Sequence, residues 1–276
     1  LEEAADDAGG GGDAVDLWLE AARVADEALG DPDRAAGLLE RGARVLGHAA
    51  LDDAVVALYE RRARWRALDA WLERRWADAE GADRARWARM RADRLAARLD
   101  DLPSAARLWA ESDALDPNPE VALRAAQAER DLGALAAAER RAAELAERAG
   151  LSPELEVALA LVRADVLETL GRREEALRVL ASARRAHPEA EVLVDAGLAL
   201  LERRGPEGPT RPEGELRSRP VDEAWVDVLA AELDRVPAAI AAPRARAAAR
   251  ACLDGPGDEA RAGALLEVAA RGPSDP

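Results

Sequence analysis

The sequence predicts an all-α fold of stacked, antiparallel helix pairs. Three observations carry this prediction: Ala, Leu and Val supply most of the apolar residues, apolar positions recur every three or four residues from Asp13 onward, and one pattern repeats along the chain. Ala and Leu are the strongest helix formers, and this spacing places apolar side chains on one face of a helix. No segment alternates apolar and polar residues convincingly enough to predict a strand.

The repeat is clearest around Ala176, which follows Gly171 and precedes Leu180, Ala183 and Pro188. This order describes a turn, then a helix with small, large and small residues on one face, then a proline stop. The same offsets recover four further anchor positions, with a degenerate copy at the second: Ala35, Leu68, Ala105 and Ala138. Consecutive anchors are separated by 33, 37, 33 and 38 residues. A helix pair cannot bury its apolar face alone, so each pair is expected to pack on its neighbours.

Two segments resemble the tetratricopeptide repeat family. Residues 166–188, VLETLGRREEALRVLASARRAHP, resemble the end of a first helix, the turn and the second helix of such a repeat, and residues 113–118, DALDPN, resemble the usual repeat ending. The anchor separations bracket the family's period of about 34 residues. The resemblance covers residues 13–204. It implies a right-handed superhelical solenoid whose first helices line a concave, peptide-binding groove.

Breaks in the helical pattern divide the chain into four parts. Residues 1–12 are acidic and Gly-rich, which predicts a flexible tail, and residues 13–204 contain the repeats. Residues 205–220 are rich in Gly and Pro and read as a loop or linker. Helices are expected again over 221–236, 237–253 and 257–271, either as degenerate repeats or as a cap, and the sequence leaves open whether they pack on the repeats.

Charge and composition narrow the range of partners. The formal charge of −16 repels phosphate backbones and anionic lipid surfaces, so we expect neither nucleic acid nor membranes as partners. Charged residues interrupt every apolar stretch before it reaches bilayer length. All 39 basic residues are Arg, which indicates the codon usage of a GC-rich bacterium. Because the chain begins at Leu1, we expect a mature form or a piece of a longer protein, in the bacterial cytoplasm or, as the alternative, the cell envelope.

Catalytic and metal-binding chemistry is not expected. Cys252 is the only cysteine and lies in an Ala-rich segment, so it reads as a small buried residue rather than a nucleophile. His48 and His187 stand at helix ends, where a structural role is favoured. No pairs of Cys or His occur at ligand spacing, and the Gly-rich tail lacks the other residues of a phosphate loop. We therefore predict no enzyme activity, no metal and no cofactor.

Arginines on the expected first helices form the sharper candidate for a binding site. Aligning the repeats by their anchors superimposes Arg91 on Arg124 and Arg94 on Gln127, each pair 33 residues apart. A guanidinium group is a planar fork that suits carboxylates, so an acidic helix or tail is the expected ligand. The alternative is that these arginines are solvated and pair with Glu on neighbouring turns. The predicted groove residues are Trp87, Arg91, Arg94, Arg98, Arg124, Gln127 and Arg130.

Five tryptophans within 45 residues are a second feature of the same region: Trp65, Trp71, Trp76, Trp87 and Trp109. They indicate either an aromatic interaction patch or core packing, and their helical spacing favours the core. The functional hypotheses are therefore a non-catalytic scaffold that binds a protein or peptide in a groove and, as the alternative, a structural spacer or self-association module. An enzyme is the third and weakest hypothesis.

Overall fold

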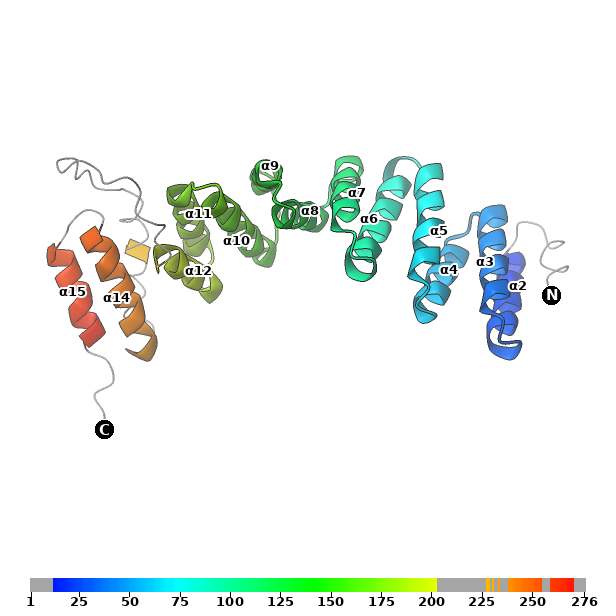
Figure 1. Cartoon of the computed structure of the whole chain (residues 1–276), viewed down its shortest axis with the longest axis horizontal. Helices are drawn as coiled ribbons and strands as arrows, with labels where there is room; N and C mark the ends of the chain where they lie inside the picture. The colour runs from blue at the N-terminus through cyan, green and yellow to red at the C-terminus, as the bar shows by residue number, and fades with distance from the viewer. Residues whose placement is uncertain are drawn as a thin grey trace, which may run out of the picture. The chain divides into compact units, whose positions relative to one another are not determined.

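The computed structural model describes residues 12–202, 227, 228, 230, 233, 238–254 and 259–270. Every regular element in this part of the chain is a helix, which confirms the predicted all-α fold class (Figure 1). The linker predicted at 205–220 lies outside the described residues. The predicted tail at 1–12, apart from its last residue, and most of the helix expected over 221–236 also lie outside them. The chain divides into two compact units, residues 1–116 (unit 1) and 117–276 (unit 2).

Unit 1 is built from three helix pairs. Its elements are α2 (Gly12–Arg23), which continues into the π-helix η1 (Val24–Ala28), α3 (Pro32–Leu46), α4 (Ala49–Arg61), α5 (Trp65–Asp78), α6 (Gly81–Arg98) and α7 (Leu102–Leu115). Each helix packs on the next, and α2 also contacts α4, so these two first helices touch as well. The first helices are thus α2, α4 and α6, and the second helices are α3, α5 and α7.

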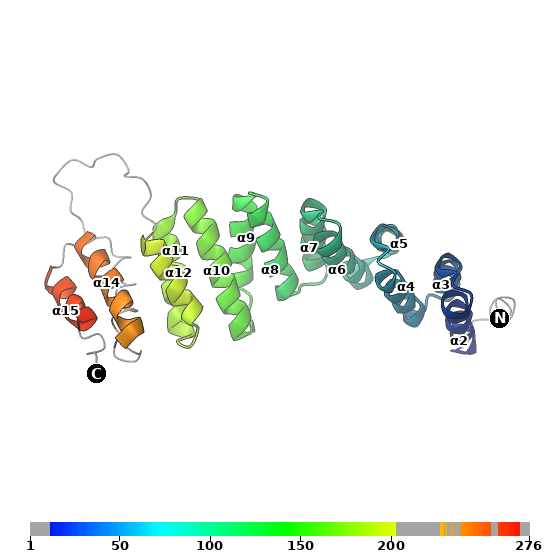
Figure 2. The same ribbon diagram turned by 60° about the horizontal axis from the view of Figure 1, so that its bottom comes forward.

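Unit 2 continues the same order of pairs. Its helices are α8 (Pro119–Asp131), α9 (Leu135–Ala146), α10 (Pro153–Thr169), α11 (Arg173–Ala186), α12 (Glu191–Glu202), α14 (Ala238–Asp254) and α15 (Glu259–Ala270). Here α8 contacts α10 and α10 contacts α12 in addition to each helix's neighbour in sequence. Figures 1 and 2 both show α10, α11 and α12 side by side.

The helices beyond the predicted linker pack on the repeats of unit 2, which answers the question that the sequence left open. Helix α14 contacts α12, and Ala245 of α14 shares one apolar cluster with Leu180 of α11 and Leu193 of α12. A hydrogen bond from buried Arg244 to Glu191 joins the same two helices, α14 and α12. Helix α15 pairs in turn with α14 (Figure 2).

The repeat anchors are fully buried in the helix pairs. All five have an exposed fraction of 0%: Ala35, Leu68, Ala105, Ala138 and Ala176. The residues four positions later are also buried: Leu39, Leu72, Trp109, Ala142 and Leu180. These two positions are one helical turn apart, so the repeating pattern marks the face of each second helix that is removed from water. The right-handed superhelix concerns both units together and stays a prediction.

The turn that precedes each anchor has one backbone requirement. Five residues before the anchor, the backbone adopts a left-handed conformation in every repeat, with φ between 52° and 76°: Gly30, Ala63, Asp100, Gly133 and Gly171. Glycine adopts this conformation without a steric cost, whereas a side chain with a Cβ is disfavoured there. Repeats with Ala63 and Asp100 therefore keep the same turn at some cost in free energy.

Side-chain caps fix where several helices begin. The carboxylate of Asp31 accepts a hydrogen bond from the amide of Arg34 (3.0 Å), and that of Asp101 accepts one from Ser104 (3.1 Å). In unit 2, Asn118 caps α8 in the same way through the amide of Val121 (3.1 Å). Proline in the first turn of these helices lacks an N–H group that would otherwise go unpaired.

We expect exchanges between Gly and Ala at this turn to change stability in opposite directions. Ala63→Gly relieves the left-handed strain and should raise the free energy of unfolding by about 0.5 to 1 kcal/mol. Gly30→Ala introduces the same strain and should lower it by a similar amount, because a Cβ at Gly30 meets no atom within 4 Å and only the backbone is affected. Urea unfolding of both variants measures the changes, and equal signs would contradict this account.

A second pair of glycines tests the packing of α3. A Cβ built on Gly42 would lie 2.8 Å from Cγ of Trp18, a side chain with 1% exposure, whereas a Cβ on Gly37 of the same helix meets nothing within 4 Å. Gly42→Ala should therefore destabilise the protein by about 1 to 3 kcal/mol through overpacking. Gly37→Ala should stabilise it by about 0.5 to 1 kcal/mol, because Ala is the better helix former. Urea unfolding of the two single variants checks both signs.

Candidate protein-binding surface

The predicted arginines of α6 lie on one face of the helix, and their exposure increases toward its C-terminal end. Only 14% of the Arg91 side chain and 24% of the Arg94 side chain are exposed to solvent, whereas Arg98 is an exposed residue. We call these three residues the α6 arginine row. The three side chains recur at helical spacing, but the residues that surround them differ.

Arg91 is held by two carboxylates of the preceding helix. Its Nε donates to Oδ1 of Asp69 (2.7 Å), and its Nη2 lies 3.2 Å from Oε1 of Glu73. Burial lowers the pKa of Arg91, but the hydrogen bond and charge of Asp69 outweigh burial, so the net pKa lies above its usual value. Arg91 is therefore a fully charged, internally paired residue of the α5–α6 contact.

Arg94 and Arg98 make contacts with the preceding repeat. Nε and Nη2 of Arg94 both donate to Oε1 of Glu60 on α4, at 3.0 and 2.7 Å. The guanidinium of Arg98 lies over the ring of Trp65, 4.8 Å from its centroid, in cation–π contact. No carboxylate of the described residues is within ion-pair distance of Arg98, so this exposed end of the row carries positive charge that these residues do not pair.

The tryptophans are divided between the core and its edge. Trp87 is 4% exposed and meets Trp71 edge to face, with ring centroids 5.5 Å apart. Trp87 is therefore placed in the core of unit 1 and not on a groove surface. Trp76 is half-buried, and its indole N–H donates to Glu111 (3.1 Å) while the guanidinium of Arg84 lies 4.5 Å from its ring centroid. The buried rings therefore belong to the core, which is the interpretation that their helical spacing favours.

The remaining predicted groove residues lie on α8 in unit 2. The Arg124 side chain is exposed, and Gln127 is half-buried. Arg130 contacts Asp131 (2.8 Å) beside it and Asp165 of α10 (3.3 Å). Because α6 and α8 belong to different units, a common groove formed by both helices stays a prediction.

Sequence reasoning missed a set of ion pairs whose partners are about one repeat apart. Arg94 and Glu60 are 34 residues apart, Arg74 and Glu40 also 34, and Arg86 and Asp53 33. Each pair joins a helix to its counterpart in the next repeat. Opposite charges recurring at the repeat period, rather than one helical turn apart, are the signal that could have indicated them.

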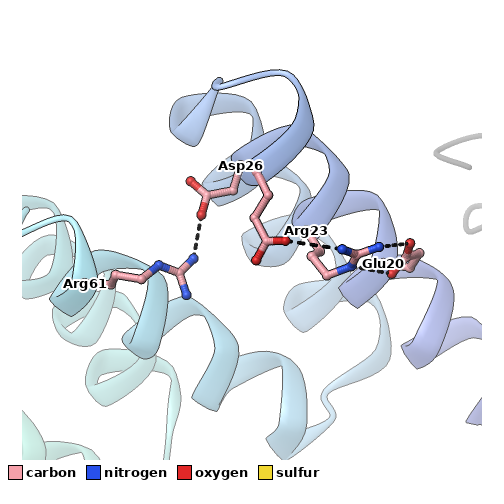
Figure 3. Close-up of polar contacts among 5 residues, drawn as sticks. Glu20, Arg23, Asp26 and Arg61 are labelled. Carbon is pink, nitrogen blue, oxygen red and sulfur yellow. Dashed lines mark hydrogen bonds and ion pairs between the residues drawn. The ribbon is translucent and has the colours of Figure 1, made fainter.

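A buried carboxylate, Asp26, makes contacts of this kind with two arginines. This residue lies in the π-helix η1, is 4% exposed, and points toward the C-terminal end of α4, as Figure 3 shows for its contact with Arg61. Nη2 of Arg61 donates to Oδ2 (2.5 Å), and Nε and Nη2 of Arg62 donate to Oδ1 (3.1 and 2.7 Å). Burial raises the pKa of Asp26, but the hydrogen bonds from Arg62 and Arg61 outweigh it, so the net pKa lies below the usual value.

Asp52 is buried to a similar extent and behaves in the opposite way. It is 3% exposed and has one arginine partner, whose Nη2 donates to Oδ2 (2.5 Å), while Oδ1 is buried without a hydrogen-bond partner. That partner, Arg75, also lies over the rings of Trp87 and Trp71, at 5.2 and 5.9 Å. Burial raises the pKa of Asp52, and the single hydrogen bond from Arg75 is too little to reverse this.

Cys252 and both histidines, to which the sequence analysis gave structural roles, lie within the described residues. No group of three or more His, Cys, Asp or Glu in that part of the chain is placed to hold a metal ion. Cys252 is buried in α14. His187 is buried at the end of α11, where its Nε2 lies 2.6 Å from Glu156, and His48 contacts the amide of Ala50 at the start of α4. Within the same residues, no helix combines the length and apolar character of a membrane span.

Comparison with known proteins finds similarity to solved structures only. No protein-family model and no curated protein matches the sequence. The matching solved structures include a tetratricopeptide repeat protein from Parabacteroides merdae, with a TM-score of 0.48 and 13% identity over 93% of this chain and 98% of that one. The all-α stack of helix pairs is defined by the chain's own buried anchors and left-handed turns.

The contrast between Asp26 and Asp52 predicts opposite dependences of stability on pH. The depressed pKa of Asp26 means that its stabilisation is present above the unfolded pKa of about 3.9 and is lost as pH falls through the folded value. The cost of Asp26→Asn should therefore shrink on acidification. The raised pKa of Asp52 reverses the sign, so the wild type gains relative to Asp52→Asn as pH falls.

Urea unfolding of the wild type and the two variants between about pH 7 and pH 3 measures both differences, with about 1.4 kcal/mol expected for each unit by which a pKa departs from its unfolded value. The same sign of slope for both variants would show that the number of arginine partners does not decide the behaviour of these two carboxylates.

Proposed function

We propose that this chain is a non-catalytic scaffold that binds an acidic segment of another protein on the first-helix side of unit 1, at the exposed end of the α6 arginine row. The observation that carries this proposal is Arg98, an exposed guanidinium that is stacked on Trp65 and has no carboxylate partner among the described residues. Stacking restricts the side chain, so less conformational entropy is lost when a carboxylate binds it. A guanidinium fork also matches a carboxylate geometrically.

The acidity of the whole chain does not prevent this interaction. The net charge of −16 repels an acidic partner at long range, but at physiological salt charges are screened beyond about 8 Å. Contact charges therefore decide binding, and the charge that Arg98 presents is positive. The wider groove, with Arg124, Gln127 and Arg130 of α8, is part of the proposal as the sequence predicted it.

A specific observation also favours the second candidate function, a structural spacer. Arg91 and Arg94 are engaged with carboxylates of their own unit, so two of the three residues in the row already stabilise the stack. A spacer needs such pairs and no free cation. The two functions therefore differ in what they require of Arg98.

Binding of a short, fluorescently labelled peptide of alternating Glu and Ser tests the proposal by anisotropy. We expect the wild type to bind this peptide and not its Gln and Ser counterpart, and Arg98→Gln to weaken binding about two- to fivefold, as for an exposed ion pair. The matched control is Arg107→Gln, because Arg107 is exposed on α7 of the same unit and has no carboxylate within ion-pair distance among the described residues.

Equal losses in the two variants would mean that only net charge matters and would contradict a site at Arg98. If the wild type binds neither peptide, the spacer is the better description.

A further inference from the structure

A second arginine surface lies at the C-terminal end of α4, outside the groove that the sequence predicted. Arg61 is the last residue of this helix, and Arg62 follows it. Both side chains are anchored at one point by Asp26, yet 58% of Arg61 and 42% of Arg62 remain exposed. Asp26 therefore fixes one side of each guanidinium group, while the rest of each side chain is open to solvent.

The anchor leaves part of each guanidinium available. Asp26 accepts from Nη2 of Arg61 and from Nε and Nη2 of Arg62, so Nε and Nη1 of Arg61 and Nη1 of Arg62 are not used by it. No other carboxylate of the described residues lies within ion-pair distance of either arginine. Two positive charges share one negative charge, and the three groups together carry a net positive charge.

The position of Asp26 is fixed by local structure. The π-helix η1 is a wide turn, closed by hydrogen bonds from the amide of Leu29 to the carbonyl of Val24 (3.0 Å) and from Asp31 to Ala25 (2.9 Å). Such turns are rare and are frequent at functional sites. A buried carboxylate held by this turn has little freedom, and it restricts both arginines in turn.

We propose that Arg61 and Arg62 form a preorganised oxyanion-binding pair, that Asp26 is its positioning residue, and that the ligand is a carboxylate or phosphate group on a segment of a partner protein. The class of partner rests on the proposed function, whereas the site does not involve Arg98. Arginine pairs suit such oxyanions because each fork presents parallel N–H donors. Fixing the forks in advance reduces the entropy lost on binding.

The partner segment is identified by its chemistry with three labelled peptides of equal length, which alternate Ser with Glu, with phosphoserine or with Gln. We expect Arg61→Gln/Arg62→Gln to weaken binding of the Glu or the phosphoserine peptide about tenfold, as for loss of a charge-assisted hydrogen bond. The charge-matched control is Arg66→Gln/Arg107→Gln, which removes two exposed arginines of unit 1 that have no carboxylate within ion-pair distance among the described residues. The peptide that shows the larger loss identifies the oxyanion.

Asp26→Asn separates preorganisation from net charge. Removing a negative charge should strengthen binding of an acidic peptide if electrostatics alone matters, whereas loss of the anchor should weaken it about threefold. Circular dichroism reports whether Asp26→Asn folds. If it does not, Arg62→Lys provides the test: this variant keeps the positive charge but removes the two-nitrogen contact with Asp26, so it should also weaken binding of the acidic peptide.

The inference would be overturned if the two double variants lost equal affinity, or if Asp26→Asn and Arg62→Lys both bound the acidic peptides as tightly as the wild type. It would also be overturned if the wild type bound neither acidic peptide. Loss in Arg98→Gln alone would leave the proposed function standing and refute this site. Loss in Arg61→Gln/Arg62→Gln alone would do the reverse.

Discussion

The structure depends on the removal of one stripe of each second helix from water. A single helix pair has too little apolar surface on its inner side to be stable alone, so each pair requires the next. The anchors satisfy this requirement with small residues such as Ala35 and Ala105, which let the helices approach closely, while larger residues four positions later, such as Leu39 and Trp109, fill the remaining space. A left-handed turn before each anchor sets the direction in which the second helix returns. Close packing and turn geometry therefore act together in every repeat.

The charged residues follow the same repeat as the core. Because the pairs repeat, a charge on one helix faces the corresponding charge of the next repeat, as Glu60 faces Arg94 and Asp53 faces Arg86. Most such pairs are partly exposed and are worth at most about 1 kcal/mol each. Asp26 is different, because a buried carboxylate without partners would be costly and its two arginines remove that cost. An acidic chain with arginine as its only cationic side chain apart from histidine can thus stabilise its stack without burying an unpaired charge there.

The sequence was sufficient to predict what depends on short-range order. Helix class, the anchors and the turns all follow from residues within one helix pair, so Ala176 and Gly171 could be placed from their spacing alone. The fate of the α6 arginine row could not be predicted, because it depends on what the neighbouring helices present to each side chain: Asp69 to Arg91, but only an aromatic ring to Arg98. The Asp26 pair was missed for the same reason. Its partners are 35 and 36 residues away and depend on a π-helical turn that no residue pattern signals.

Repetition also decides where a binding surface is possible on such a protein. A residue in the middle of the arginine row lies within reach of carboxylates on an adjoining helix, so its positive charge is paired within the stack. At the C-terminal ends of α4 and α6, fewer carboxylates of the described residues reach the arginines: Asp26 serves Arg61 and Arg62 together, and none serves Arg98. Arg98 is the last residue of α6, and Arg61 is the last residue of α4, with Arg62 directly after it; all three keep exposed positive charge. On these two first helices of unit 1, recognition of an acidic partner is therefore expected at the C-terminal end more than along the helix face.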